Sequence, residues 1–185
     1  MKSLIGKILI VIGWTLLTIA ATIVISDYLE VYGAYKASEQ VMGELEKAIE
    51  REIVTTKDIE IADRKYVGVI EIPTLDIKLP VLEECTDINL KISPCKYYGD
   101  VYKNENMVLA AHNYPKFFGN IKHLKKGDDI YFTALNGNEI EYKVDKIETL
   151  YPEDVEGMTN TEYELSLFSC NYPKDKRVTV RCIKQ

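Results

Sequence analysis

The first 26 residues of this 185-residue chain contain no acidic side chain. All 29 Asp and Glu residues lie at or after Asp27, and the only charged residues before it are Lys2 and Lys7. The chain as a whole has a formal charge of −6, so it lacks the basic excess that is typical of nucleic-acid-binding proteins. We therefore expect no nucleic-acid partner, and we expect the two ends of the chain to occupy different environments.

A long apolar run without any charge covers Ile8–Ile25, which is eighteen residues long. As a helix it would extend about 27 Å, close to the thickness of a bilayer's hydrocarbon core. The positive-inside rule places residues 1–7 in the cytoplasm, 8–25 in the membrane and the rest outside the cell. A cleaved signal peptide is the alternative, with Ala20–Thr22 as a weak cleavage site. The apolar run continues beyond that site, so its length favours an uncleaved anchor.

Histidine and cysteine are also scarce. There are two histidines, His112 and His123, and four cysteines with no CxxC pair: Cys85, Cys95, Cys170 and Cys182. This pattern disfavours a structural zinc site and a disulfide-dense scaffold, and at least one thiol can serve chemistry. Cys85 and Cys95 flank a turn-prone stretch and could form an extracellular disulfide.

No metal site and no cofactor are expected from these residues. Three acidic residues, Glu83, Glu84 and Asp87, nevertheless leave a calcium requirement open.

A helical stalk is expected after the membrane segment. Apolar residues recur every three or four positions over Tyr28–Glu52, which is typical of an amphipathic helix. The stalk either packs one face on the following domain or acts as a solvated spacer. Thr55–Lys65 is polar and forms the junction, so residues 26–64 are assigned to an extracellular stalk and junction.

From Tyr66 the apolar period changes from helical to that of strands. The expected strands are Tyr66–Ile72, Leu75–Val81, Met107–Ala111, Asp129–Thr133, Glu139–Val144, Leu165–Ser169 and Arg177–Cys182. Asn136-Gly137 is a strong hairpin signal between two of them. Seven or eight short strands without long intervening helices predict a mainly β fold, an antiparallel barrel or sandwich.

Three reactive residues stand at the ends of these strands. His112 and Cys170 each end a strand, and Arg177 opens the last one. A histidine can activate a cysteine for attack on an acyl group, and an arginine can stabilise the resulting oxyanion. His123 is expected at the surface, and Cys182 in the core.

The sequence around these residues resembles the sortase family. Segment 108–113 (VLAAHN) resembles the strand that delivers the catalytic histidine, 165–170 (LSLFSC) the Thr-Leu-x-Thr-Cys motif, and 177–180 (RVTV) the strand that begins with the catalytic arginine. Segment 66–73 (YVGVIEIP) and the LKKGDDI segment at 124–130 match in the same order. The resemblance covers nearly all of Tyr66–Ile183.

The resemblance implies a fold and a reaction. The fold is an eight-stranded sortase-type β-barrel with short helices over residues 65–185. The reaction is transpeptidation at an LPxTG-like sorting motif of a secreted protein. Cys170 is the implied nucleophile, His112 the acid–base residue and Arg177 the oxyanion and substrate ligand, with Ser169 and Asn113 as implied substrate-binding residues. The acyl acceptor is an amine of peptidoglycan or a lysine of another protein.

Some positions depart from the family pattern. Ala111 replaces a usual glycine and Ser169 a usual threonine, and the loop from Cys170 to Arg177 is short. The subclass stays open between a small class B-like and a class D-like branch. Arg181 shares a strand face with Arg177, although the motif favours Arg177. A membrane-tethered cysteine peptidase and an inactive peptide-binding barrel are the alternative functions.

Overall fold

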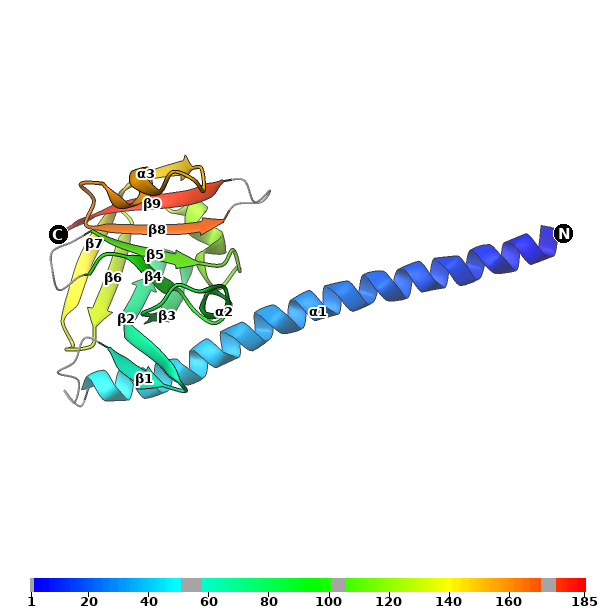
Figure 1. Ribbon diagram of the computed structural model, residues 1–185, viewed down its shortest axis with the longest axis horizontal. Helices are drawn as coiled ribbons and strands as arrows, with labels where there is room; N and C mark the ends of the chain where they lie inside the picture. The colour runs from blue at the N-terminus through cyan, green and yellow to red at the C-terminus, as the bar shows by residue number, and fades with distance from the viewer. Residues whose placement is uncertain (1, 51–57, 101–105, 171–175) are drawn as a thin grey trace. The chain divides into compact units, whose positions relative to one another are not determined.

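The computed structural model describes residues 2–50, 58–100, 106–170 and 176–185 (Figure 1). The chain divides into two compact units, Met1–Ala34 and Tyr35–Gln185. Helix α1 (Lys2–Glu50) supplies the first unit, and its last part, Tyr35–Glu50, belongs to the second.

The first unit is a helix with an apolar, exposed surface. Trp14 and Leu17, for example, are more than half exposed. Within the described part of the chain, α1 is the one helix that is long and apolar enough to cross a membrane. A surface of this kind is favourable in lipid and costly in water, which fits the membrane anchor or signal expected from the sequence.

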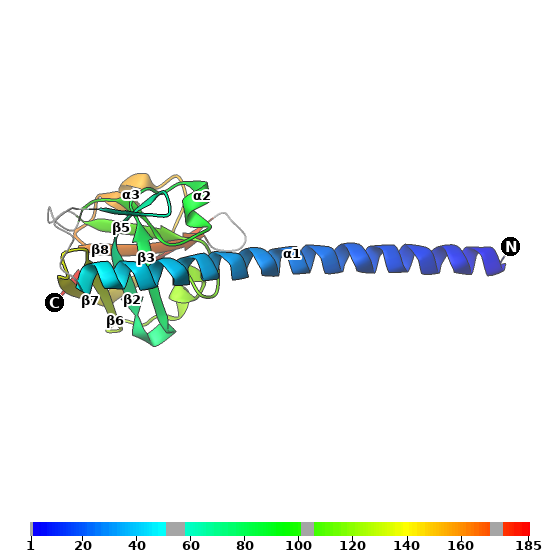
Figure 2. The same cartoon turned by 90° about the horizontal axis from the view of Figure 1, so that it is seen from below.

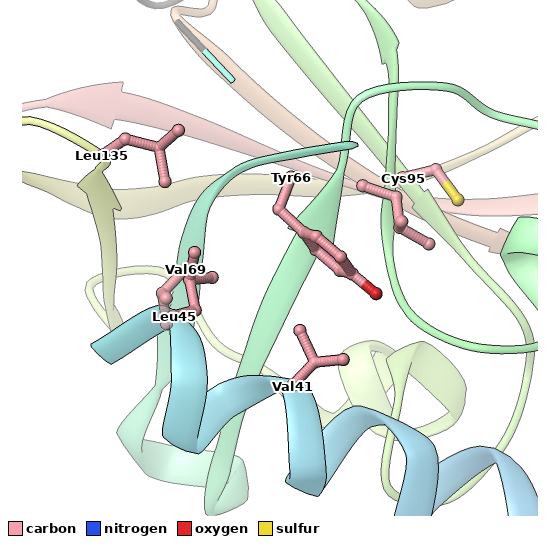
Figure 3. Packing of buried hydrophobic residues seen from close by; sticks show 7 residues of the cluster. Val41, Leu45, Tyr66, Val69, Cys95 and Leu135 are labelled. Carbon is pink, nitrogen blue, oxygen red and sulfur yellow. The ribbon is translucent and has the colours of Figure 1, made fainter. Parts of the chain in front are cut away.

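In the second unit, the end of α1 packs on the β-domain. Val41 and Leu45, four residues apart on one helix face, are buried in a cluster with Tyr66 and Val69 (Figure 3). Figure 2 shows this end of the helix, in cyan, lying over β2 and β3. Of the two arrangements expected for the stalk, the packed one is therefore correct for Tyr35–Glu50; residues 51 and 52 of the expected helix lie outside the described residues.

The described residues of the domain form nine strands and several short helices. The strands are β1 (Ile59–Ile61), β2 (Arg64–Ile72), β3 (Ile77–Leu82), β4 (Cys95–Tyr98), β5 (Met107–Ala111), β6 (Asp129–Ala134), β7 (Glu139–Leu150), β8 (Leu165–Cys170) and β9 (Arg177–Lys184). The helices are η1 (Pro73–Leu75), α2 (Asp87–Leu90), η3 (Phe118–His123) and α3 (Val155–Thr159). The two very short strands β1 and β4 were not expected from the sequence.

Eight of these strands close into a barrel. The order is β1-β2-β3-β4-β5-β8-β9-β7-β6, and β6 also pairs with β2, which joins the two ends of the sheet. β1 stays outside this ring, in a hairpin with β2. The expected eight-stranded β-barrel is confirmed.

The strand directions differ from the expected antiparallel pattern at two places. β3 pairs with β4 in parallel, and β5 pairs with β8 in parallel. The chain leaves β5, makes the β6–β7 hairpin, and only then returns beside β5 as β8. The barrel is therefore mixed. The sequence did not predict this, because strand periodicity indicates which residues face the core but not which strands become neighbours.

Candidate active site

The three candidate catalytic residues lie at one end of three adjacent strands. β5 and β8 run in parallel with Ala111 opposite Ser169, so His112 and Cys170 follow directly at the same end. β8 and β9 run antiparallel with Cys170 opposite Arg177. The fold thus brings together residues that are 58 and 7 positions apart in the sequence.

Strand alternation places Cys170 and Arg177 on one face of the sheet. Ala110 and Phe168 pack together in an apolar cluster on the outer side of the sheet. Cys170 lies two residues after Phe168 on β8 and opposite Arg177 on β9, so Cys170 and Arg177 share that face. His112 follows directly after the end of β5. Cys170 is exposed and His112 is half-buried, so the thiol can meet a peptide from solvent while the imidazole is held by its surroundings.

Two aromatic rings flank the Arg177 guanidinium. Its central carbon lies 4.8 Å from the ring centre of Phe168 and 5.7 Å from that of Tyr97. The two rings meet edge to face, with centres 5.1 Å apart. Cation–π contact with both rings restrains the plane of the guanidinium.

Two of the three donor atoms of Arg177 have no partner in the part of the chain that the structure describes. Its Nε and Nη1 atoms are buried and have no hydrogen-bond partner among the described residues. A buried donor without a partner is costly, and a substrate carbonyl or an oxyanion would satisfy it. These donors can therefore bind a peptide that reaches Cys170.

The turn after His112 is tightly built. The imidazole ring lies 5.1 Å from the ring of Tyr114, which in turn contacts Phe117 at 5.6 Å. The carbonyl of Tyr114 accepts hydrogen bonds from the backbone N–H of Phe117 and of Gly119. A Cβ on Gly119 would lie 2.7 Å from that carbonyl oxygen, so glycine permits the close approach.

The two expected substrate-binding residues occupy different positions. Asn113 is exposed directly after His112. Ser169 is 2% exposed, and its side chain lies on the face opposite Cys170, toward the barrel interior. Its hydroxyl has no hydrogen-bond partner among the described residues. In this arrangement Ser169 can contribute to the site through its backbone rather than its hydroxyl.

Arg181, the competing arginine, is buried and donates hydrogen bonds to other groups of the fold. It is 1% exposed; its Nε donates to Glu148 at 2.8 Å, and its Nη1 donates to Ser166 at 2.9 Å and to the carbonyl of Met158 at 3.2 Å. Its Nη2 donates to the carbonyl of Gly157 in α3. Arg181 therefore fastens α3 to the barrel with four of its five N–H donors, and its burial keeps it from a substrate.

Sequence reasoning did not identify Tyr97, Phe168 and Cys85 as neighbours of the site. Phe168 belongs to the LSLFSC string, but its contact with Arg177 depends on cross-strand register. Tyr97 lies on β4, which is too short to show a clear period. The charge of Arg177 also acts on the Cys85 thiol, lowering its pKa, although a hydrogen bond with Cys95 is the larger cause.

Other expectations concern metals and the surface. His123 is exposed and Cys182 is buried, as expected. Among the residues that the structure describes, no three His, Cys, Asp or Glu side chains gather into a metal-binding group.

Comparison with known proteins finds relatives of this chain. A model of the sortase domain matches residues 70–185. The chain is 30% identical to sortase A of Bacillus anthracis over 146 residues, which cover 76% of this chain and 69% of that protein. It is 25% identical to sortase A of Staphylococcus aureus over 193 residues, covering 95% and 92% of the two chains.

The solved structure of a Clostridium perfringens sortase D5 transpeptidase shares the fold. It has a TM-score of 0.65 and 21% identity, and the match covers 82% of this chain and 97% of that one. Solved sortases named A, C and D all match, so these comparisons do not separate the subclasses.

Proposed function

Because the chain belongs to the sortase family of cysteine transpeptidases, we propose that it cleaves an LPxTG-like sorting motif and transfers the acyl product to an amine. The observation that carries this proposal is the position of Cys170. Its exposed thiol lies at a strand end, between His112, which directly follows β5, and two unpartnered donor atoms of Arg177 on β9.

In the first half-reaction the Cys170 thiolate attacks the scissile carbonyl carbon. The carbonyl oxygen becomes an oxyanion, and Arg177 donates hydrogen bonds to it. The C–N bond then breaks, and His112 gives a proton to the leaving amine. The N-terminal part of the substrate stays bound to Cys170 as a thioester.

In the second half-reaction an amine replaces Cys170. His112, now neutral, accepts a proton from the incoming amine, which attacks the thioester carbonyl and releases the Cys170 thiolate. The acceptor would be a peptidoglycan amine or a lysine of another surface protein. The substrates would be secreted proteins with C-terminal sorting signals.

The apolar N-terminal helix supports a location at the cell membrane. We assign residues 1–7 to the cytoplasm, 8–25 to the membrane, 26–64 to the extracellular stalk and junction and 65–185 to the catalytic barrel. This orientation follows from Lys2 and Lys7 on one side of the apolar run and Asp27 on the other. It would put the site on the side of the membrane where secreted substrates emerge.

Two alternatives share the same residues but differ in product. A membrane-tethered cysteine peptidase would release the free acid, because water would take the place of the amine. An inactive peptide-binding barrel would release no product.

A ligation assay separates these three functions. The full-length chain in detergent is incubated with a labelled sorting-motif peptide and a panel of amines that includes glycine peptides and lysine peptides. We expect an amide-linked product that depends on the amine, and its absence in Cys170→Ala. Hydrolysis alone in the presence of every amine would support the peptidase, and binding without turnover would support the inactive barrel.

A further inference from the structure

Two cysteines lie beside the candidate active site, and the proposed mechanism uses neither of them. Cys95 begins β4 and pairs with Leu82, the last residue of β3. Cys85 follows β3 by three residues. The parallel pairing of these strands therefore brings the two cysteines together although ten positions separate them in the sequence.

Both cysteines are free thiols in contact with the same packing cluster. Cys95 is fully buried with Val41, Leu45 and Tyr66 (Figure 3). The Cys95 thiol donates to the carbonyl of Ser93 at 3.4 Å. Cys85 is half-buried and packs against the cluster that contains Cys95, and of the two thiols Cys85 is the one reachable from solvent.

The two thiols differ in acidity. The hydrogen bond with Cys95 lowers the pKa of Cys85 despite its partial burial, and the positive charge of Arg177 adds to this effect. The same hydrogen bond, together with burial, raises the pKa of Cys95. Cys85 is therefore the thiol that more readily forms the reactive thiolate.

We propose that Cys85 and Cys95 form a redox-active dithiol site that closes to a disulfide on reaction with a small-molecule disulfide. The Cys85 thiolate attacks one sulfur of the reagent and releases the first small-molecule thiolate, which leaves a mixed disulfide on Cys85. Cys95 then attacks the Cys85 sulfur, and its proton passes to the second small-molecule thiolate as that thiolate leaves. The protein loses two hydrogens, and the reagent is reduced to two thiols.

The new bond would fasten the segment that contains α2 to the start of β4. It would close a short loop in the unfolded chain, which lowers the entropy gained on unfolding. For a domain of this size we expect the melting temperature to rise by about 5–10 °C.

The test uses the full-length Cys170→Ala variant in detergent, so that the candidate nucleophile does not react with the reagent. The chain is treated with bis(2-hydroxyethyl) disulfide, and its intact mass, alkylatable thiols and melting temperature are measured. We expect a loss of two hydrogen masses, a Cys85–Cys95 peptide pair after proteolysis, a free thiol on buried Cys182, and the higher melting temperature. Reduction should reverse all of these changes.

Matched variants test the order of the steps. With Cys95→Ala added, the reagent should remain on Cys85 as a stable mixed disulfide; with Cys85→Ala added, the chain should take up little reagent. The proposal is overturned if all three thiols of the Cys170→Ala chain stay alkylatable, or if Cys85 keeps the reagent while Cys95 is present. Because Cys170 is absent, either result is independent of the transpeptidase proposal.

Discussion

The two arginines of β9 differ in how their side-chain donors are used. Arg177 has buried donors without partners among the described residues, whereas Arg181 uses its donors on Glu148, Ser166 and the backbone of α3. We therefore propose that the same residue type serves substrate chemistry at position 177 and the fold at position 181.

Replacing each arginine by lysine should separate these roles. Lysine keeps the charge but loses the planar fork of donors. We expect Arg177→Lys to lower kcat about 10²- to 10³-fold with little change in melting temperature, as for loss of an oxyanion donor. Arg181→Lys should lower the melting temperature while the folded fraction keeps its turnover. Steady-state rates and thermal melts measure both effects. An Arg181→Lys variant that loses turnover but keeps the parent's melting temperature would contradict the assignment.

Tyr97 should act as a positioning residue for Arg177. A cation–π contact contributes about 0.5–2 kcal/mol, so Tyr97→Ala should lower kcat/KM roughly 2- to 30-fold. Tyr97→Phe keeps the ring and should restore most of the activity. Tyr98 is an exposed neighbour on the same strand, and Tyr98→Ala serves as the control. If Tyr97→Phe were as impaired as Tyr97→Ala, the hydroxyl rather than the ring would be important, and our account of this contact would be wrong.

Local sequence could name His112, Cys170 and Arg177 as candidates because each stands in a motif at a strand end. It could not find the rings around Arg177. Phe168 and Arg177 meet because β8 pairs with β9 in one register, and Tyr97 joins them from β4. Such contacts depend on pairing between distant segments, which no single string encodes.

Among the elements, β2 and β6 form the seam that closes the barrel, and Gly68 lies on it. A Cβ on Gly68 would meet the carbonyl oxygen of Thr133 at 2.5 Å and the Phe132 ring at 2.7 Å. Gly68→Ala should therefore lower the melting temperature strongly, with a cost of about 1–3 kcal/mol for overpacking.

Gly43 in α1 is the matched control for that substitution. A Cβ there meets nothing within 4 Å, and alanine is the better helix former. Gly43→Ala should leave the melting temperature unchanged or raise it slightly. A Gly68→Ala variant as stable as the parent would show that the seam is not closely packed.

The link between β7 and β9 should be sensitive to acid. Burial raises the pKa of Glu148, but hydrogen bonds from Lys146 and Arg181 outweigh burial and hold it below the ordinary value. An acid with a depressed folded pKa contributes stability above its unfolded pKa, near 4.3, and loses it as the pH falls through the folded value. We expect the melting temperature to fall below about pH 4.3.

A Glu148→Gln variant tests that assignment. It should be less stable than the parent near neutral pH, and the difference should shrink as the pH falls. Equal differences at every pH between 3 and 7 (roughly the titration range of carboxyls) would assign the acid sensitivity to other carboxylates.

Elements with clear alternation could be predicted from sequence, and the hairpin at Asn136-Gly137 formed as expected between β6 and β7. β1 and β4 could not be predicted, because strands of three or four residues are too short to show a clear alternation of apolar and polar residues. The parallel pairing of β5 with β8 could not be predicted for another reason, because tertiary packing decides which strands become neighbours across the intervening hairpin.

At the scale of the whole molecule, the composition already indicates that the two parts of the chain suit different environments. The charge-free run in α1 suits lipid, and the acidic β-domain suits water. The closed barrel then gives Cys170, His112 and Arg177 a rigid support at one end of three adjacent strands. We propose that this support serves covalent catalysis through Cys170.

The most direct test is the intact mass of the full-length chain during turnover. The chain in detergent is mixed with a sorting-motif peptide without any amine acceptor and is quenched in acid. We predict an added mass equal to the N-terminal acyl fragment of the peptide, mapped by proteolysis to Cys170 and absent in Cys170→Ala. Peptide cleavage by Cys170→Ala, or an acyl group attached at another residue, would contradict the account.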